Sequence, residues 1–214
     1  MIKRDYYLNK LIDYKDKDVI KIITGIRRCG KSFLLFNIYY DYLLSIGVND
    51  ENIIRINLES IRYEKLRNSN SLFEYLDKLI NKHDKYYIFI DEIQLVDNFE
   101  DVVNGIKIDF NCDLYITGSN SKLLSSEINT KLRGRGIEIK VFPLSFKEFY
   151  DGTSDKTTSF NNYIKYGGLP YINSLEKEYE KIEYLKMLND TVATKDIIER
   201  NKIRNEEVFN AVID

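Results

Sequence analysis

The chain has 214 residues, 43% of them hydrophobic, which is enough for one sizeable domain or for one domain with a small appendage. Its 32 basic and 34 acidic residues nearly cancel, so the overall charge gives no general argument for binding nucleic acid or an acidic membrane. Two cysteines and one histidine are too few for a structural zinc site or a disulfide framework, and this composition fits a reducing cytoplasm.

No part of the sequence has the pattern of a membrane-spanning or secretion segment. The first nine residues are polar and lack an apolar core, and no later apolar run approaches about 18 residues. We therefore expect a cytoplasmic protein that does not contact a membrane.

Five segments have the residue pattern of β-strands, and helical patterns lie between them. Such alternation predicts an α/β fold with a parallel sheet between helices. Residues 86–90 are a continuous apolar run, which is typical of a central strand, whereas 54–58 and 137–141 alternate and are expected to have one solvated face. The predicted strands are residues 19–24, 53–58, 86–91, 113–117 and 137–142.

Two of the intervening segments carry clear helix signals. Residues 32–46 are apolar on nearly every side, which predicts a helix buried under the sheet. Residues 71–80 open with Ser71 followed three positions later by Glu74, the pattern of a capping box.

The pattern changes after Pro143, where a short helical segment at 145–150 is followed by a polar linker at 151–159. Helices are expected at 160–166 and from residue 175 toward 196. We place a domain boundary in the linker, so that residues 1–150 form the core and 151–214 form a helical lid with the start of a further C-terminal region. A last amphipathic stretch at 206–212 ends without a stop signal, and we expect the chain to be cut short there.

A glycine-rich motif follows the first predicted strand. Residues 25–32 read G-x-x-x-x-G-K-S between a strand and an apolar helix, an order in which backbone N–H groups and a helix N-terminus surround a phosphate. Lys31 is expected to bridge the β- and γ-phosphates of a nucleotide, and the Ser32 hydroxyl to ligate Mg²⁺. The residues assigned to nucleotide binding are Gly25, Ile26, Arg27, Arg28, Cys29, Gly30, Lys31, Ser32 and Phe33.

Three side chains inside this loop leave alternatives open. Cys29 could have a redox role, or it could be a small side chain at a variable loop position. Arg27 and Arg28 could meet phosphate or the acidic face of a partner, or they could point to solvent.

Two carboxylates, Asp91 and Glu92, end the continuous apolar strand. A nucleotide hydrolase needs such a pair beside its phosphates. We assign Asp91, together with Ser32, to the magnesium site, and Glu92 to polarising the attacking water. Hydrophobic strands also end in acidic residues by chance, and the pairing with the glycine-rich loop is what favours the functional interpretation.

Four further residues are candidates for catalysis. Ser119 and Asn120 follow the fourth strand and could reach the γ-phosphate or the attacking water, or one of them could cap the next helix. Arg133 and Arg135 precede the last strand, where an arginine could stabilise charge on a γ-phosphate in its own subunit or in a neighbour's, or could be a solvated surface residue. The catalytic candidates are Glu92, Lys31, Asn120, Ser119, Arg135 and Arg133.

Taken in order, these motifs resemble those of bacterial and archaeal AAA+-type P-loop ATPases. The resemblance implies a sheet order of 5-1-4-3-2, a helical lid, and ATP with Mg²⁺ as ligands. It also implies a C-terminal part with a winged-helix-like module and a poorly characterised domain, most of which this chain would lack. The matching pieces are a GIRRCGKS-like Walker A loop at 25–32, a DEIQ Walker B motif at 91–94, TGS at 117–119, GRG at 134–136 and PLSF at 143–146.

The leading hypothesis is a Mg²⁺-dependent ATPase in which binding or hydrolysis moves the lid against the core. A nucleotide-loaded switch or interaction module with little hydrolysis is the alternative. A P-loop kinase is a third hypothesis, which the carboxylate pair disfavours. ATP or ADP is the expected ligand, a homo-oligomer or a protein partner is allowed, and nucleic-acid binding stays open and would fall to the missing C-terminal part.

Overall fold

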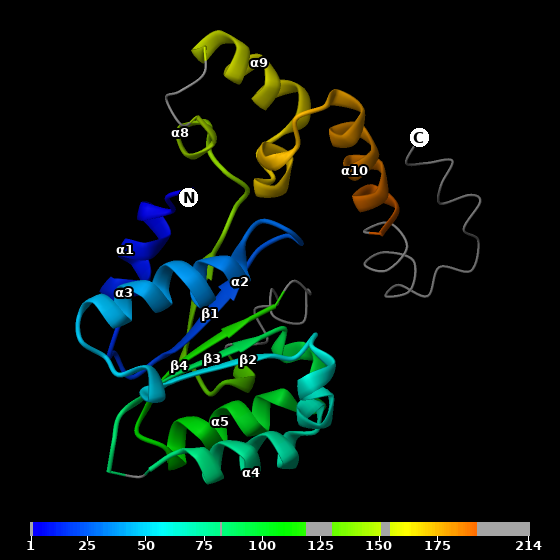
Figure 1. Ribbon diagram of the computed structural model, residues 1–214. Helices are drawn as coiled ribbons and strands as arrows, with labels where there is room; N and C mark the ends of the chain where they lie inside the picture. Colours follow the sequence, from blue (N-terminus) through cyan, green and yellow to red (C-terminus); the bar gives the residue numbers. More distant parts are fainter. Residues whose placement is uncertain (1, 82, 119–129, 151–154, 192–214) are drawn as a thin grey trace. The chain divides into compact units, whose positions relative to one another are not determined.

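The computed structural model describes residues 2–81, 83–118, 130–150 and 155–191 (Figure 1). The chain divides into two compact units, Met1–Pro143 and Leu144–Asp214, which are described one after the other. The segment predicted as a polar linker, 151–159, falls inside the second unit. No helix in the described ranges is long and apolar enough to cross a membrane.

A five-stranded parallel sheet forms the centre of the first unit. Its strands are β1 (Ile20–Thr24), β2 (Ile53–Asn57), β3 (Tyr86–Asp91), β4 (Cys112–Thr117) and β5 (Gly136–Lys140). They lie in the order β2-β3-β4-β1-β5, which confirms the predicted α/β class and, counted from the other edge, the predicted order 5-1-4-3-2. Ile22 of β1 is paired with Ile116 of β4 on one side and with Glu138 of β5 on the other.

Burial follows the position of each strand in the sheet. Every residue of β1, β3 and β4 is buried, whereas the edge strands β2 and β5 mix buried and exposed residues. A central strand of a parallel sheet needs apolar residues on both sides because helices cover both faces, while an edge strand does not. The prediction of a central strand at β3 and of half-solvated strands at β2 and β5 is therefore confirmed.

Helices cover both faces of this sheet (Figure 1). One face packs against α1 (Asp5–Asp13) and against an uninterrupted helical run made of α2 (Lys31–Phe33), a π-helical segment (Leu34–Tyr39) and α3 (Tyr40–Ser45). The other face packs against α4 (Ser69–Leu79) and α5 (Phe99–Asp109). Short 3-10 helices span Asp50–Asn52, Ile61–Arg67 and Ile93–Leu95.

The structure corrects the predicted start of α4. The helix begins at Ser69 rather than Ser71, because the Asn68 side chain caps it by accepting the Ser71 N–H (3.1 Å). Ser71 is thus a donor to the cap, and the capping box predicted from Ser71 and Glu74 is wrong. The helical run after the glycine-rich loop lies where it was predicted, but its π-helical centre is a conformation that an apolar pattern does not distinguish.

The second unit is helical throughout its described part. It contains α8 (Phe146–Phe149), α9 (Lys156–Tyr166), a 3-10 helix (Pro170–Ser174) and α10 (Glu178–Thr191). Asp155 caps α9 by accepting the Thr158 N–H (2.7 Å), so this helix begins inside the segment predicted as a polar linker. The helical patterns predicted beyond residue 191 lie outside the described residues.

A small cluster holds the second unit together. Tyr166, Leu169 and Ile172 are buried, and the partly buried side chains of Tyr184, Leu185 and Leu188 from α10 pack on them. An ion pair between Lys165 and Glu178 (2.5 Å) also joins α9 to α10. Both of its side chains are exposed, so it adds little to stability.

Candidate nucleotide-binding site

The segments predicted to bind nucleotide meet at one edge of the sheet. The glycine-rich loop follows β1, Asp91 ends β3 and Thr117 ends β4. The carboxyl ends of parallel strands lie at the same edge, which is where open α/β sheets bind their ligands. Ile23 is paired with Thr117 and Asn57 with Asp91, so these strand ends are level with one another.

The start of the glycine-rich loop fits closely against the end of β5. Gly25 has φ +148°, and a Cβ at this position would lie 2.2 Å from the Val141 carbonyl oxygen. No side chain fits in that space, so the position requires glycine. The Cys29 side chain contacts the same carbonyl, with Sγ 3.4 Å from its oxygen.

The residue after Val141 is tied to the beginning of α1. The Phe142 carbonyl accepts a hydrogen bond from the Arg4 guanidinium (2.6 Å), and the Phe142 N–H donates to the Tyr7 hydroxyl (3.0 Å). Both backbone polar groups of Phe142 are therefore held by side chains of the N-terminal segment.

Cys29 has the surroundings of a packing residue. Its side chain is fully buried, and burial raises the pKa of its thiol. Reactive cysteines are exposed and have a lowered pKa, so the structure favours packing over the redox alternative. Of the two loop arginines, Arg28 is exposed and has a left-handed backbone (φ +64°), while Arg27 is partly buried.

Lys31 is folded over the loop that it follows. Its Nζ donates hydrogen bonds to the carbonyl oxygens of Gly25 (3.0 Å) and Ile26 (3.1 Å), and only 5% of the residue is exposed.

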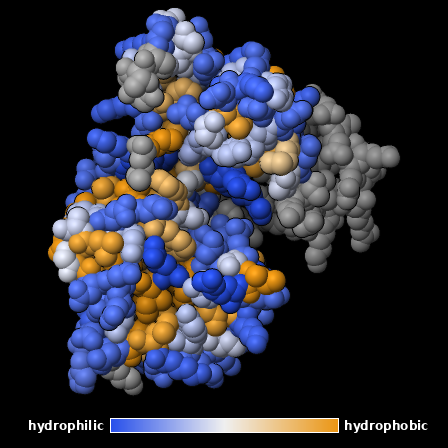
Figure 2. All heavy atoms as spheres, viewed as in Figure 1, coloured by the Kyte–Doolittle hydropathy of each residue, from blue (hydrophilic) through white to orange (hydrophobic). Residues whose placement is uncertain are grey.

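Two other residues of the predicted nucleotide-binding set, Ile26 and Phe33, are among the exposed large hydrophobic residues of the first unit. On the face shown in Figure 2, the hydrophobic side chains of this unit form several patches between hydrophilic ones.

Asp91 connects the glycine-rich loop with the neighbouring strand end. Its carboxylate accepts a hydrogen bond from the Thr117 hydroxyl, and the Ser32 side chain is near enough to lower the pKa of the Asp91 carboxyl. The residue is 2% exposed, and burial raises the pKa of its carboxyl although Thr117 and Ser32 both oppose this shift. The two predicted magnesium ligands, Ser32 and Asp91, are thus neighbours at this edge.

Glu92 is held by both its backbone and its side chain. It has a left-handed backbone (φ +55°), which is uncommon for a residue other than glycine. Its N–H donates to the Thr117 hydroxyl oxygen (3.3 Å), and its carboxylate accepts a hydrogen bond from the Gln94 side-chain amide. The carboxylate predicted to polarise water is therefore fixed beside the predicted magnesium ligand.

Thr117 and Glu59, which also lie at this edge, were not among the predicted site residues. Thr117 contacts both Asp91 and Glu92 and so sets the geometry of the pair. Glu59, just beyond the end of β2, is close enough for its charge to add to the effect of burial in raising the pKa of Asp91. Thr117 could have been found from its place at the end of a central strand, but the loop that positions Glu59 has no sequence signal.

The structure separates Arg133 and Arg135 from the glycine-rich loop. Both precede β5, and the Arg135 carbonyl accepts the N–H of Ile20, the first residue of β1. They therefore lie at the amino edge of the sheet, and the five residues of β1 put about 13 Å between the two edges at ~3.3 Å per residue. This placement favours action on the phosphate of a neighbouring subunit over action on a phosphate in the same subunit. Ser119 and Asn120 lie outside the described residues.

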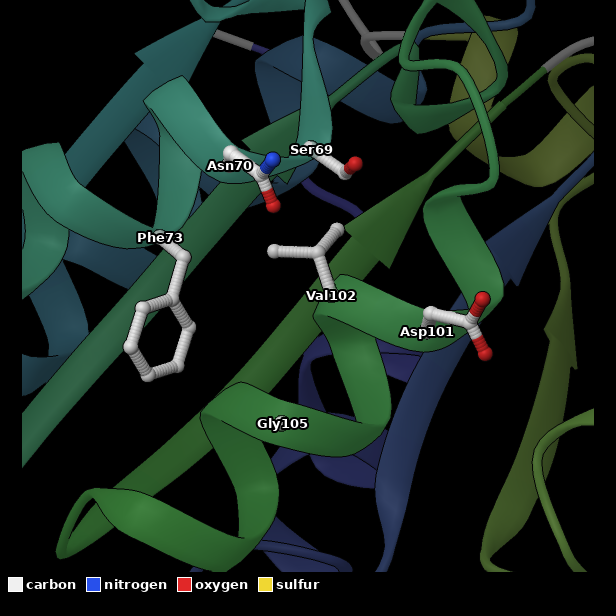
Figure 3. Close-up of a pocket in the computed structure, with 6 residues that line it drawn as sticks. All are labelled: Ser69, Asn70, Phe73, Asp101, Val102 and Gly105. Atoms are coloured by element: carbon white, nitrogen blue, oxygen red, sulfur yellow. The ribbon is translucent and has the colours of Figure 1, made fainter.

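A hollow between two helices of the first unit is separate from the residues described so far (Figure 3). It is a shallow cavity of about 180 Å³ between α4 and α5. Its lining offers one carboxylate and no basic group, so it is unsuited to phosphate. The lining residues are Ser69, Asn70, Phe73, Asp101, Val102 and Gly105.

A family model described as AAA domain matches residues 17–150, more than half of the chain. The chain belongs to the AAA domain family. The family match and the parallel sheet support one part of the resemblance to AAA+-type P-loop ATPases, namely that the chain contains an AAA domain.

Two curated relatives match this AAA domain protein along nearly its whole length, and both are described as uncharacterized. One, from Haemophilus influenzae, is 39% identical over 220 residues, covering 100% of this chain and 54% of the relative. The other, from Methanocaldococcus jannaschii, is 36% identical over 222 residues, covering 96% of this chain and 46% of the relative. The chain thus spans about half the length of the curated relatives it matches.

A solved structure shows the same fold at lower sequence identity. The Walker-type ATPase PABY2304 of Pyrococcus abyssi is 17% identical, with a TM-score of 0.58, over 87% of this chain and 68% of that one. At this identity the likeness supports the fold of the AAA domain and not its substrate.

Proposed function

We propose that the chain binds Mg·ATP at residues 25–32 and hydrolyses it, and that binding or hydrolysis shifts the helical second unit. One observation supports this most directly. The Ser32 side chain, at the end of the glycine-rich loop, lies near enough to the Asp91 carboxylate at the end of β3 to lower its pKa. A loop suited to phosphate and a carboxylate suited to magnesium are thereby brought into one site.

Lys31 is the residue proposed to contact the β- and γ-phosphates. Its Nζ hydrogen-bonds two loop carbonyls, and phosphate oxygens are stronger acceptors because they are charged. Exchanging carbonyl oxygens for phosphate oxygens needs only a rearrangement of the lysine side chain. The N–H groups of residues 26–32 and the start of the following helical run add further donors and a partial positive charge.

The donor set fits magnesium. Mg²⁺ prefers oxygen ligands, keeps several waters, and is usually bound through one or two carboxylates together with substrate phosphates. Ser32 would bind the ion directly and Asp91 through water. In the part of the chain that the structure describes, no group of three or more His, Cys, Asp or Glu is arranged to hold a metal on its own. The ion would neutralise charge on the β- and γ-phosphate oxygens.

Glu92 is proposed to orient the attacking water and to accept its proton. The water oxygen forms a bond to the γ-phosphorus, and the bond from that phosphorus to the β–γ bridging oxygen breaks. The electron pair of the broken bond leaves with ADP, and inorganic phosphate is the second product. Ser119 and Asn120 stay predictions for contacts to the γ-phosphate or the water.

Arg133 and Arg135 are proposed to act on the nucleotide of a neighbouring copy of the chain. Their place at the amino edge supports this assignment, because it keeps them away from their own phosphate loop. An arginine supplied by a neighbour stabilises charge on the γ-phosphate as the bond breaks. The proposal therefore includes a homo-oligomer.

Calorimetric titration with ATP, ADP and GTP in the presence of Mg²⁺, run beside a phosphate-release assay, tests the proposal. We expect adenine-selective binding that Lys31→Ala abolishes, while Lys78→Ala, which alters an exposed lysine of α4, leaves it unchanged. Absence of nucleotide binding by the unaltered chain would refute the proposed function.

The second variant in this test, Glu92→Gln, separates hydrolysis from binding. We expect ATP binding to persist and phosphate release to fall by about 100-fold or more, as for loss of a general base. Tight ATP binding without measurable release by the unaltered chain would instead identify a nucleotide-loaded switch.

A further inference from the structure

Gln94, whose side chain touches the Glu92 carboxylate, was not among the predicted catalytic or binding residues. Gln94 lies in the 3-10 helix Ile93–Leu95, directly after the acidic pair, and its amide Nε2 donates a hydrogen bond to Glu92 Oε2. The helix is anchored in the core, since Ile93 and Val96 on either side of Gln94 are buried. The amide is therefore presented from a fixed backbone.

The orientation of the amide follows from the chemistry of its partner. An ionised carboxylate only accepts hydrogen bonds, so the amide nitrogen must face it. Oε1 of Gln94 then points elsewhere, and within the described ranges this buried oxygen receives no hydrogen bond. A buried acceptor without a donor destabilises the folded protein, because it has lost its hydrogen bonds to water.

This cost argues against a purely structural role. A side chain kept at this position for packing alone would be better as an apolar group of the same length, because it would bury no unpaired oxygen. The amide does provide one contact that an apolar group could not, the hydrogen bond to Glu92. We therefore expect the Gln94 amide to serve by orienting the Glu92 carboxylate.

We propose that Gln94 is a positioning residue that fixes the direction of the Glu92 carboxylate toward the attacking water. Thr117 holds the backbone of Glu92 and Gln94 holds its side chain, so the carboxylate is constrained from two elements. Preorganisation of this kind raises the rate of the chemical step without changing the affinity for substrate. The inference rests on the proposed ATPase function.

Gln94→Met tests the inference, because methionine keeps the length of the side chain and removes both polar atoms. We expect kcat for ATP hydrolysis to fall by about 10-fold or more, with KM and the Kd for Mg·ATP unchanged within about twofold. We also expect Tm to be unchanged or raised. Leu95→Ala, on the same 3-10 helix but 38% exposed, is the matched control and should keep the activity of the unaltered chain.

A double-mutant cycle then distinguishes positioning from a general structural effect. If Gln94 acts through Glu92, adding Gln94→Met to Glu92→Gln changes the residual rate by less than about twofold. A kcat for Gln94→Met within twofold of the unaltered chain, or a parallel loss of ATP affinity and Tm, overturns the inference while the ATPase function stands. An unaltered chain that binds no ATP overturns both.

Discussion

Lys21 and Asp113 form an ion pair in which neither side chain is exposed by more than 1%. The pair lies toward the amino edge of the sheet, where Asp113 also accepts hydrogen bonds from the Asp16 N–H (2.8 Å) and the Tyr115 hydroxyl (2.8 Å). Lys21 in turn donates to the Lys17 carbonyl (2.8 Å). The network joins the segment before β1 to β4, and it is remote from the proposed nucleotide site.

Replacing one partner of this pair should destabilise the protein strongly. Asp113→Ala leaves the Lys21 ammonium buried without its counter-charge, and we expect the free energy of unfolding to fall by about 3–5 kcal/mol. Urea denaturation measures this loss. Asp109→Ala, at an exposed position at the end of α5, is the control and should change stability by less than about 0.5 kcal/mol. A loss below about 1 kcal/mol for Asp113→Ala would show that the pair is not buried in solution.

The ionised Asp16 carboxylate should stabilise the protein at neutral pH but not in strong acid. Its burial would raise the pKa of its carboxyl, but hydrogen bonds from Lys15, Lys85 and Tyr87 outweigh burial and lower the pKa to about 2. Because the folded-state pKa is below the unfolded value near 4, the stabilisation is present above pH 4 and is lost as the pH falls toward 2. The Asp16 side chain is 39% exposed, so we expect less than about 1 kcal/mol after solvent screening.

Asp16→Asn is the variant that measures this effect, because asparagine tolerates the left-handed backbone at this position (φ +62°). We expect its stability deficit at pH 7 to shrink between pH 4 and pH 2, and to shrink also in 0.5–1 M salt at about neutral pH. A deficit independent of pH would mean that the charge of Asp16 is not involved.

Asp91 should have the opposite effect on stability. Burial raises the pKa of its carboxyl, so its contribution to stability is present at low pH and is lost as the pH rises through the folded-state pKa. Asp91→Asn removes the buried charge, and we expect Tm of the nucleotide-free protein at pH 7.5 to rise, by about 2–4 °C for each kcal/mol gained. Phosphate release should be abolished. Asp97→Asn, an exposed neighbour, should alter neither property, and a lower Tm for Asp91→Asn would contradict the prediction.

Gly25 and Gly47 provide a matched pair for testing the phosphate loop. Both have positive φ, but a Cβ at Gly25 would meet the Val141 oxygen at 2.2 Å, whereas one at Gly47 would meet nothing within 4 Å. Gly47→Ala should lower the free energy of unfolding by about 1 kcal/mol, because alanine is strained at positive φ but meets no other atom there. Gly25→Ala should lower the free energy of unfolding by more than Gly47→Ala does, and it should abolish ATP binding measured by calorimetry. Equal effects of the two substitutions would show that the contact with Val141 does not constrain the loop.

Subunit mixing tests the proposed action of Arg135 on a neighbour. Arg135→Ala subunits keep the phosphate loop, and Lys31→Ala subunits keep the arginine, so a mixture should recover part of the ATPase activity that each lacks alone. The double variant Lys31→Ala with Arg135→Ala is the control, since it has neither group to contribute. The assignment of Arg135 to a neighbour's nucleotide would be ruled out by either of two results. One is recovered ATPase activity in a mixture that contains the double variant, and the other is no recovery in the mixture of the two single variants.

The elements that follow strong periodic or compositional patterns could be predicted from the sequence. A buried parallel strand such as β3 has to be continuously apolar, and a phosphate loop needs glycines at fixed spacing. The order of the strands came from the resemblance and not from the patterns. α1 and α5 were not identified, and Asn68 was overlooked as the cap of α4 because two serines follow it.

The edge of the sheet at which the two arginines lie follows from its topology. A parallel sheet already implies that residues preceding β5 lie at the edge opposite to residues following β1, so the placement of Arg133 and Arg135 could have been derived. The contacts of Thr117 with Asp91 and Glu92 could not, because they depend on side-chain directions at two neighbouring strand ends.

The fit of Gly25 against Val141 has a mechanical consequence. A loop that bends to admit a phosphate cannot pull its first residue away from β5 independently, since the two backbones are in contact and share the Val141 carbonyl with Cys29. Two residues later the first unit ends at Pro143, and Phe142 between them is clamped to the N-terminal segment by Arg4 and Tyr7. A displacement of the loop at Gly25 would therefore press on the Val141 backbone, directly before a residue whose backbone the N-terminal segment holds in place.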